Sequence, residues 1–275
     1  MRRKVFGWLC GLFIISTLSA AGQSVTEAPD MDAALTQKWT WSMDQVASTQ
    51  HDIWIVFAFE RLMCENCYMG SFYNDSDRNR TSIEEVLLGK RPASLSVRKA
   101  ARKAIDHIDG TEQKMVTKSM AVLIRLEKGV VTDVDISNLT SQFDFDSDPI
   151  LWLGSASTSE SFDVLEDLFS PRLSEDSQKG IVWAIGSLNM PDRSLEFLSD
   201  IVTDNRSEEV RKAAVYSIGN QDVARSVSIL KGIIDGDESK EVQKAAIYSL
   251  GNNDTPQARQ ALLDIIEEMG HESSS

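Results

Sequence analysis

The chain has 275 residues and a formal net charge of −14, because 42 acidic residues stand against 28 basic ones. A nucleic-acid-binding protein needs basic residues to neutralise phosphates, so this balance excludes nucleic acid as the main partner. The length of the chain allows two modest domains or one domain with an extended array.

Residues 1–22 have the pattern of a secretory signal peptide. A basic tip is followed by the apolar run Val5–Leu18 and by small residues, with cleavage expected after Ala21 or Gly22. The alternative is a retained anchor, but the apolar run is short for a bilayer, which takes about 20 residues. No other segment is apolar enough to cross a membrane. We therefore predict an exported protein, periplasmic or secreted.

Residues 23–45 are polar and predict a flexible leader. The region 46–143 mixes strand and helix patterns and predicts a small α+β domain. Its expected elements are a buried strand over Ile53–Phe59, a returning strand over Tyr68–Tyr73, helices over 81–88 and 94–108, and a hairpin of 121–126 with 130–136.

Cys64 and Cys67 form a Cys-x-x-Cys pair just after the first expected strand. In an exported protein this pair is a local disulfide or two free thiols. A redox centre would place the first cysteine at a helix N-terminus, where the dipole activates the thiol, whereas this pair lies between expected strands. Two thiolates could also supply half of a zinc site, with His51 or His107 as a further ligand. The sequence leaves these alternatives open.

The C-terminal half contains an internal repeat. The segment Val210–Gly219, VRKAAVYSIG, returns as VQKAAIYSLG at Val242–Gly251, a spacing typical of stacked repeats. Apolar or small residues recur every third or fourth position, which predicts an amphipathic helix ending at glycine. Weaker copies end at Gly154 and Gly186, and a second apolar-periodic segment follows each glycine. Residues 144–275 therefore predict about four helix pairs stacked as an α-solenoid.

These helices resemble HEAT repeats, in the short bacterial form named after phycobilisome lyases, whose helices carry the pattern VRxAAxxALG. The resemblance implies an α-solenoid that binds other proteins. The segment MAVLIRLEKGVVTDVDIS precedes these helices. The combination of this segment and the helices is similar to secreted bacterial HEAT-repeat proteins. A bilin lyase is an enzymatic alternative, but such an enzyme works in the cytoplasm, which conflicts with the signal peptide. The fold is thus predicted to be mainly α, with the solenoid behind the small α+β domain.

When the second helices of the repeats are aligned with one another, carboxylates recur at two equivalent positions. Both positions lie on the side of the helix opposite the apolar stripe. The HEAT resemblance implies that this side lines the concave face. The expected acidic surface comprises Asp163, Asp167, Glu196, Asp200 and Asp264. It would receive a basic segment of a partner protein, or the basic stretch Arg98–Lys103 of the same chain. A solvated polar face is the alternative, and calcium is less favoured because carboxylates alone make no defined cage.

Leu151, Trp183, Tyr216 and Tyr248 occupy equivalent repeat positions and are expected to pack between neighbouring repeats; a row that stacks on a ligand is the alternative. The sequence contains no catalytic triad, phosphate-binding glycine loop or paired-carboxylate motif. We therefore predict a non-catalytic protein-interaction scaffold that needs no cofactor or metal. A Cys-x-x-Cys redox or metal-binding envelope protein is the alternative function.

Overall fold

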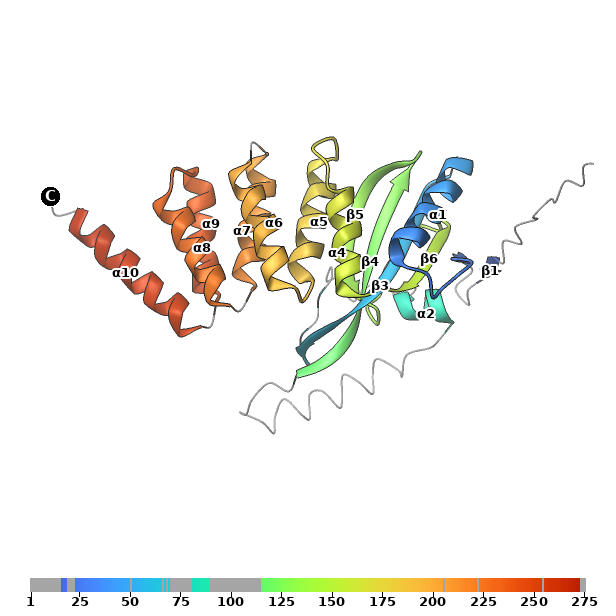
Figure 1. Ribbon diagram of the computed structural model, residues 1–275, viewed down its shortest axis with the longest axis horizontal. Coiled ribbons are helices and arrows are strands. Elements are labelled where there is room, and N and C mark those ends of the chain that lie inside the picture. Colours follow the sequence, from blue (N-terminus) through green and yellow to red (C-terminus); the bar gives the residue numbers. More distant parts are fainter. Residues whose placement is uncertain are drawn as a thin grey trace, which may run out of the picture.

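The computed structural model describes residues 16–18, 23–49, 51–65, 67, 69, 81–89, 115–204, 206–221, 223–253 and 255–272. Figure 1 shows a twisted sheet with helices beside it, followed by a row of helices that continues to the C-terminal end. The strands are β1 Ser16–Leu18, β2 Ser24–Glu27, β3 Ile53–Cys64, β4 Met115–Glu127, β5 Val130–Asn138 and β6 Ile150–Ser155. The helices are α1 Leu35–Ser48, α2 Ile83–Leu88, α4 Thr158–Leu168, α5 Glu175–Ser187, α6 Pro191–Thr203, α7 Glu208–Gly219, α8 Ala224–Asp235, α9 Lys240–Gly251 and α10 Pro256–Glu272.

The strands form one mixed sheet in the order β1-β2-β6-β3-β4-β5. β6 runs parallel to both of its neighbours, β2 and β3, whereas the other adjacent strands are antiparallel. The β3–β4 ladder extends to the pair of Cys64 and Met115, past the last partners that β6 and β5 provide. The sheet therefore ends in a two-stranded ribbon, which we call the β3–β4 ribbon.

Both faces of the sheet are covered. Alternate side chains of β3, such as Phe57 and Phe59, pack in a core with α1, α4 and α5. The intervening residues, with Trp54 among them, pack on the opposite face with α2 and with Phe143 and Phe145. Burial on both faces explains why β3 begins as an uninterrupted apolar run instead of an alternating one.

Two predicted elements of the N-terminal part are confirmed. The predicted hairpin is β4 and β5, joined through Lys128 and Gly129, and Gly129 adopts a φ of +79° that glycine tolerates without steric cost. The helix predicted over 81–88 is α2, whose first turn is capped by Ser82 and which ends at Gly89 with a φ of +63°. The helix predicted over 94–108 lies outside the described residues.

The flexible leader predicted over 23–45 is wrong, because these residues form β2 and most of α1. β2 pairs with β6, and α1 lies over the sheet with Leu35 and Val46 in the core. Lys38 is also buried on this helix, and its Nζ donates to two backbone carbonyls at 3.2 and 3.4 Å. This polar segment is ordered because one narrow stripe of buried side chains on α1 packs in the core. The polar composition of the segment gives little sign of that stripe.

Two further expectations need correction. The strand predicted to end at Phe59 continues to Cys64, and its antiparallel partner is β4; the returning strand predicted over 68–73 lies outside the described residues except for Met69. The segment 149–154, predicted as a degenerate repeat helix, contains strand β6. Its apolar run is too short for periodicity to distinguish a buried strand from a helix. The sheet thus extends to Ser155, and the helical part begins at α4 instead of at residue 144.

The helical part contains α4 and three pairs, α5–α6, α7–α8 and α9–α10. The predicted apolar faces of α7 and α9 are confirmed as buried. Serine hydroxyls cap the first turns of α4, α5, α7 and α9 by accepting a backbone N–H; the capping residues are Ser157, Ser174, Ser207 and Ser239. In space, α6 lies against α7 and α8 against α9, while α5, α7 and α9 contact one another in turn (Figure 1). α5 also packs on β5, which joins the row of helices to the sheet.

Candidate functional site

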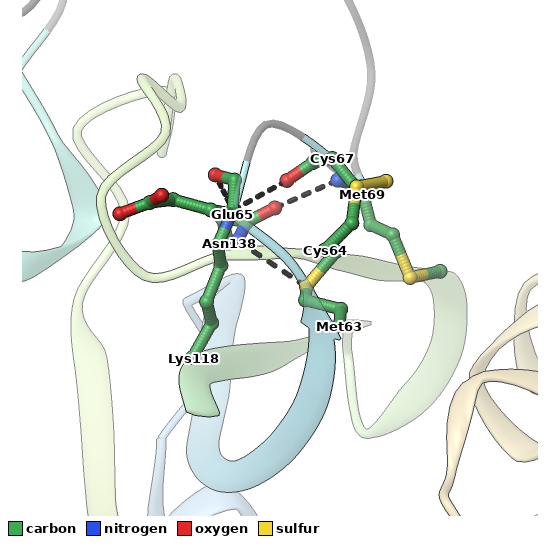
Figure 2. Close-up of a disulfide and its surroundings, with 7 residues drawn as sticks. All are labelled: Met63, Cys64, Glu65, Cys67, Met69, Lys118 and Asn138. Carbon is green, nitrogen blue, oxygen red and sulfur yellow. Dashed lines mark hydrogen bonds between the residues drawn. A yellow bond between two sulfur atoms is a disulfide. The ribbon is translucent and has the colours of Figure 1, made fainter. Parts of the chain in front are cut away.

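The Cys-x-x-Cys pair lies at the tip of the β3–β4 ribbon. Cys64 and Cys67 are joined by a disulfide (Figure 2). Their Cα atoms lie 5.1 Å apart. Cys64 is buried as the last residue of β3, whereas Cys67 is exposed. Because Cys64 ends a strand, the pair lacks the helix N-terminus that activates a cysteine in thioredoxin-like redox centres.

Two side chains hold the disulfide loop on the ribbon. Lys118 of β4 donates from Nζ to the carbonyl oxygens of Glu65 and Cys67 at 2.8 and 2.6 Å. Asn138 bonds twice with Met69: its backbone N–H donates to the Met69 carbonyl at 3.1 Å, and its Oδ1 accepts the Met69 N–H at 2.7 Å (Figure 2). These contacts and the disulfide together fix the loop. The cysteine pair therefore has a structural role.

A cleft of about 540 Å³ adjoins this disulfide, between the β3–β4 ribbon and the C-terminal ends of α5 and α7. The ribbon side contributes thioethers, and the helical side contributes an indole and side-chain amides. These lining residues are Met63, Met69, Met115, Trp183, Asn220 and Gln221. Sequence analysis missed the cleft because its walls come from distant segments. The sequence near the cleft offers one weak signal, the apolar residue Leu62 next to the polar pair Glu60 and Arg61; its side chain is 49% exposed.

The five carboxylates predicted to form one acidic surface fall into two groups. Asp163 pairs with Arg193 of α6 at 2.8 Å, a cation that it shares with Glu166, and Asp264 pairs with Lys231 of α8 at 3.6 Å. The other three are exposed and form no ion pair with the described residues; they are Asp167 on α4 and Glu196 and Asp200 on α6. The unpaired carboxylates of the predicted surface therefore lie on α4 and α6.

The first helices carry a different and internally neutralised surface. Each pairs a lysine with an acid three residues earlier at 2.7 Å; the pairs are Asp176–Lys179, Glu209–Lys212 and Glu241–Lys244. The hydrogen bond to the carboxylate raises the pKa of the Lys179 and Lys212 ammonium groups. Both lysines thus stay charged, and this face offers a charged partner little net attraction.

The aromatic row lies on the same first helices. The rings of Trp183 and Tyr216 are parallel with centroids 6.4 Å apart, and Tyr216 meets Tyr248 edge to face at 6.2 Å. These contacts join neighbouring repeats, as predicted. The row is nevertheless partly open to solvent, because Trp183 is 37% and Tyr248 63% exposed.

Several other predicted features contribute no site in the part of the chain that is described. The basic stretch Arg98–Lys103 and His107 lie outside it, and His51 is exposed. Within it, no group of three or more His, Cys, Asp or Glu side chains is arranged to hold a metal ion. Also within it, no helix is both long and apolar enough to span a bilayer.

A family model described as HEAT repeats matches residues 195–271. This segment runs from within α6 to the end of α10, and it includes both strong copies of the internal repeat. The match and the helix pairs together support HEAT repeats in the C-terminal part of the chain. No curated protein matches the sequence.

Proposed function

We propose that this protein is an exported, non-catalytic scaffold that binds a basic segment of another protein through helices α4 and α6. HEAT repeats suggest a protein-interaction scaffold, and such a repeat matches residues 195–271. The basic character of the partner and the place where it binds are the new parts of this proposal.

The observation that carries the proposal is the unequal neutralisation of surface charge. On the first helices, each repeated carboxylate has a lysine beside it. On α4 and α6, Asp167, Glu196 and Asp200 have no such partner among the described residues. Unpaired carboxylates on adjacent helices attract a cationic segment and speed its encounter, an effect that salt screens within about 10 Å at 0.1 M.

Export is proposed from the N-terminal sequence pattern. Cleavage after Ala21 or Gly22 would remove β1 and leave β2 as the first strand, still paired with β6. It would also remove three basic residues and no acid, which makes the formal charge of −14 more negative. The mass of the protein recovered from the culture medium or the periplasm would identify the cleavage site, and an intact N-terminus there would contradict the proposal.

The double charge reversal Asp167→Lys with Asp200→Lys tests the binding surface. We use a fluorescent octalysine peptide as the probe and measure its binding by anisotropy at several salt concentrations. The variant should bind at least about tenfold more weakly, because four units of charge change near the peptide. It should also show a smaller salt dependence than the parent.

The matched control is Asp32→Lys with Asp44→Lys, which changes net charge equally at exposed sites of the N-terminal part. This control should retain most of the binding. Equal losses in both variants would mean that the peptide responds only to the overall charge of the protein, and the α4–α6 surface would no longer be a binding site.

A further inference from the structure

The cleft beside the disulfide has room for a small molecule. Its volume of about 540 Å³ lies within the range of small-molecule sites, about 300 to 1,000 Å³. Three of its lining side chains are apolar and open to solvent: Leu62 is 49% exposed, Met115 53% and Trp183 37%. Exposed apolar side chains that gather at one concave place are typical of a binding site.

The β3–β4 ribbon forms an apolar wall of this cleft. Leu62 and the thioethers of Met63, Met69 and Met115 line it, and Figure 2 shows Met63 and Met69 beside the disulfide. Among the described residues that line the cleft, Arg61 is the only one with a formal charge, and its Nη1 donates to the Met69 sulfur at 2.6 Å. An ionised group of a ligand would lose its hydration at such a wall with little to replace it. A neutral ligand therefore fits the cleft.

The opposite wall, made by the ends of α5 and α7, combines a ring with hydrogen-bonding groups. The indole of Trp183 belongs to it, together with the side-chain amides of Asn189 and Asn220. Both asparagines are exposed, and their amides form no hydrogen bond with the described residues. Each amide thus offers two donor hydrogens and one acceptor oxygen to a ligand.

Ser217 adds a hydroxyl without a partner to the cleft. The residue is 1% exposed, and its Oγ forms no hydrogen bond with the described residues. Ser249, its equivalent in the next repeat, does not line the cleft and donates to the Val215 carbonyl at 3.4 Å. Buried hydroxyls in native proteins are nearly always hydrogen-bonded. The exception at Ser217 therefore points to a polar group that enters the cleft.

We propose that this cleft binds a neutral pyranose sugar, with the sugar ring between the indole of Trp183 and the thioether wall. A pyranose ring carries C–H groups on its two faces and hydroxyl groups around its rim. The faces match the indole and the thioethers, because the electron-rich face of an aromatic ring attracts C–H groups. The rim matches the Asn220 amide and the Ser217 hydroxyl, which can both donate and accept.

A peptide of similar volume is a poorer occupant. The N–H and C=O groups of an extended backbone point to both sides, so about half of them would face the apolar ribbon wall without a hydrogen-bond partner. This argument applies equally to a partner's peptide and to any other segment of this chain. The proposal concerns different residues from the acidic α4–α6 surface and does not depend on it.

Saturation-transfer NMR with the full chain tests whether the cleft accepts a sugar. The probes are cellobiose, maltose and N,N′-diacetylchitobiose, each at up to about 10 mM. At least one should bind with a dissociation constant of about 1 mM or tighter, and its affinity should not change with salt because the sugar is uncharged. Absence of binding by all of these probes would overturn the proposal. Displacement of the bound sugar by a lower concentration of acetyl-tetraalanine amide would assign the cleft to a peptide instead.

Trp183→Ala should weaken the binding of the sugar at least about tenfold, because it removes the ring on which the sugar packs. The matched control is Tyr248→Ala, which removes the equivalent ring of a later repeat outside the cleft. This control should keep the affinity of the parent. Equal losses in the two variants would place the sugar on the aromatic row and would overturn the assignment to the cleft.

Ser217→Ala separates binding from stability. The unfolding midpoint should stay at the parent value, because the hydroxyl forms no hydrogen bond with the described residues of the free protein. The affinity for the sugar should fall about fivefold, the loss expected for one hydrogen bond. A lower midpoint with unchanged affinity would give the hydroxyl a structural role and would overturn the proposed arrangement.

Discussion

The two ends of the row of helices differ in what covers them. At the inner end, α5 packs on β5 so closely that Gly180 lies against the Val134 carbonyl oxygen. At the outer end, Tyr248, Leu263 and Ile266 are exposed, and no described residue would come within 4 Å of a Cβ built on Gly251. Repeat arrays need a cap at each end because every unit buries only its neighbours. In this protein the sheet caps the inner end, whereas no described element covers the outer side of α9 and α10.

The largest effect should come from Gly180→Val at the inner end. The new side chain would have to displace the backbone of β5 or of α5, because a Cβ there meets the Val134 carbonyl. We expect a loss of about 3 kcal/mol or more in the free energy of unfolding. Urea denaturation followed by circular dichroism measures this loss, and a parent-like midpoint would mean that the sheet does not cap the helices.

The next largest effect is a difference in stability between alanine variants of the inner Gly219 and the outer Gly251. Gly219→Ala should destabilise by about 1–3 kcal/mol, because its Cβ would collide with Ser249. Gly251→Ala should be neutral or stabilise by up to about 0.5 kcal/mol, because alanine has the higher helix propensity. Denaturant midpoints of the two single variants provide the comparison, and equal shifts would remove the distinction between the covered and the open positions.

Removal of the disulfide, which lies near the inner end of the row, should lower the stability of the protein moderately. Cys64→Ser with Cys67→Ser opens a short loop, whose closure entropy is worth about 2 kcal/mol at most, and Lys118 and Asn138 still hold the loop. The unfolding midpoint should fall by a few degrees without loss of helical signal. Full alkylation of both cysteines in the native parent without reductant would contradict the disulfide itself.

The smallest effect should be a pH dependence at Glu160, which links α4 to α1. The backbone N–H of Leu35 donates to its carboxylate at 3.0 Å, and the Ser157 N–H and hydroxyl donate as well. The hydrogen bond from Leu35 contributes most, and together these bonds lower the pKa of Glu160 below its ordinary value of 4.5. The unfolded state then binds more protons, so this stabilisation is complete above pH 4.5 and is lost as pH falls through the lowered pKa.

Glu160→Gln is the variant that isolates this group. Its midpoint should be slightly lower than that of the parent at pH 7, and the difference should shrink as the pH falls below 4.5. A constant difference between pH 7 and pH 3 would show that the ionised carboxylate does not stabilise the link between α4 and α1.

The sequence by itself determined the helical repeat. Val210–Gly219 and Val242–Gly251 specify amphipathic helices ending at glycine, because the period of buried residues is a local property of the chain. The hairpin of β4 and β5 and the capped helix α2 were predicted for the same reason. Each depends on residues close together in sequence.

Tertiary structure alone decided the rest. β2 and β6 belong to the sheet because they pair with each other across more than a hundred residues, which no local pattern encodes. Likewise, the carboxylates of Asp163 and Asp264 pair with cations on neighbouring helices, while Asp167 forms no ion pair with the described residues. The open end also follows only from packing, since Gly219 and Gly251 have the same sequence context and differ in whether a helix lies over them.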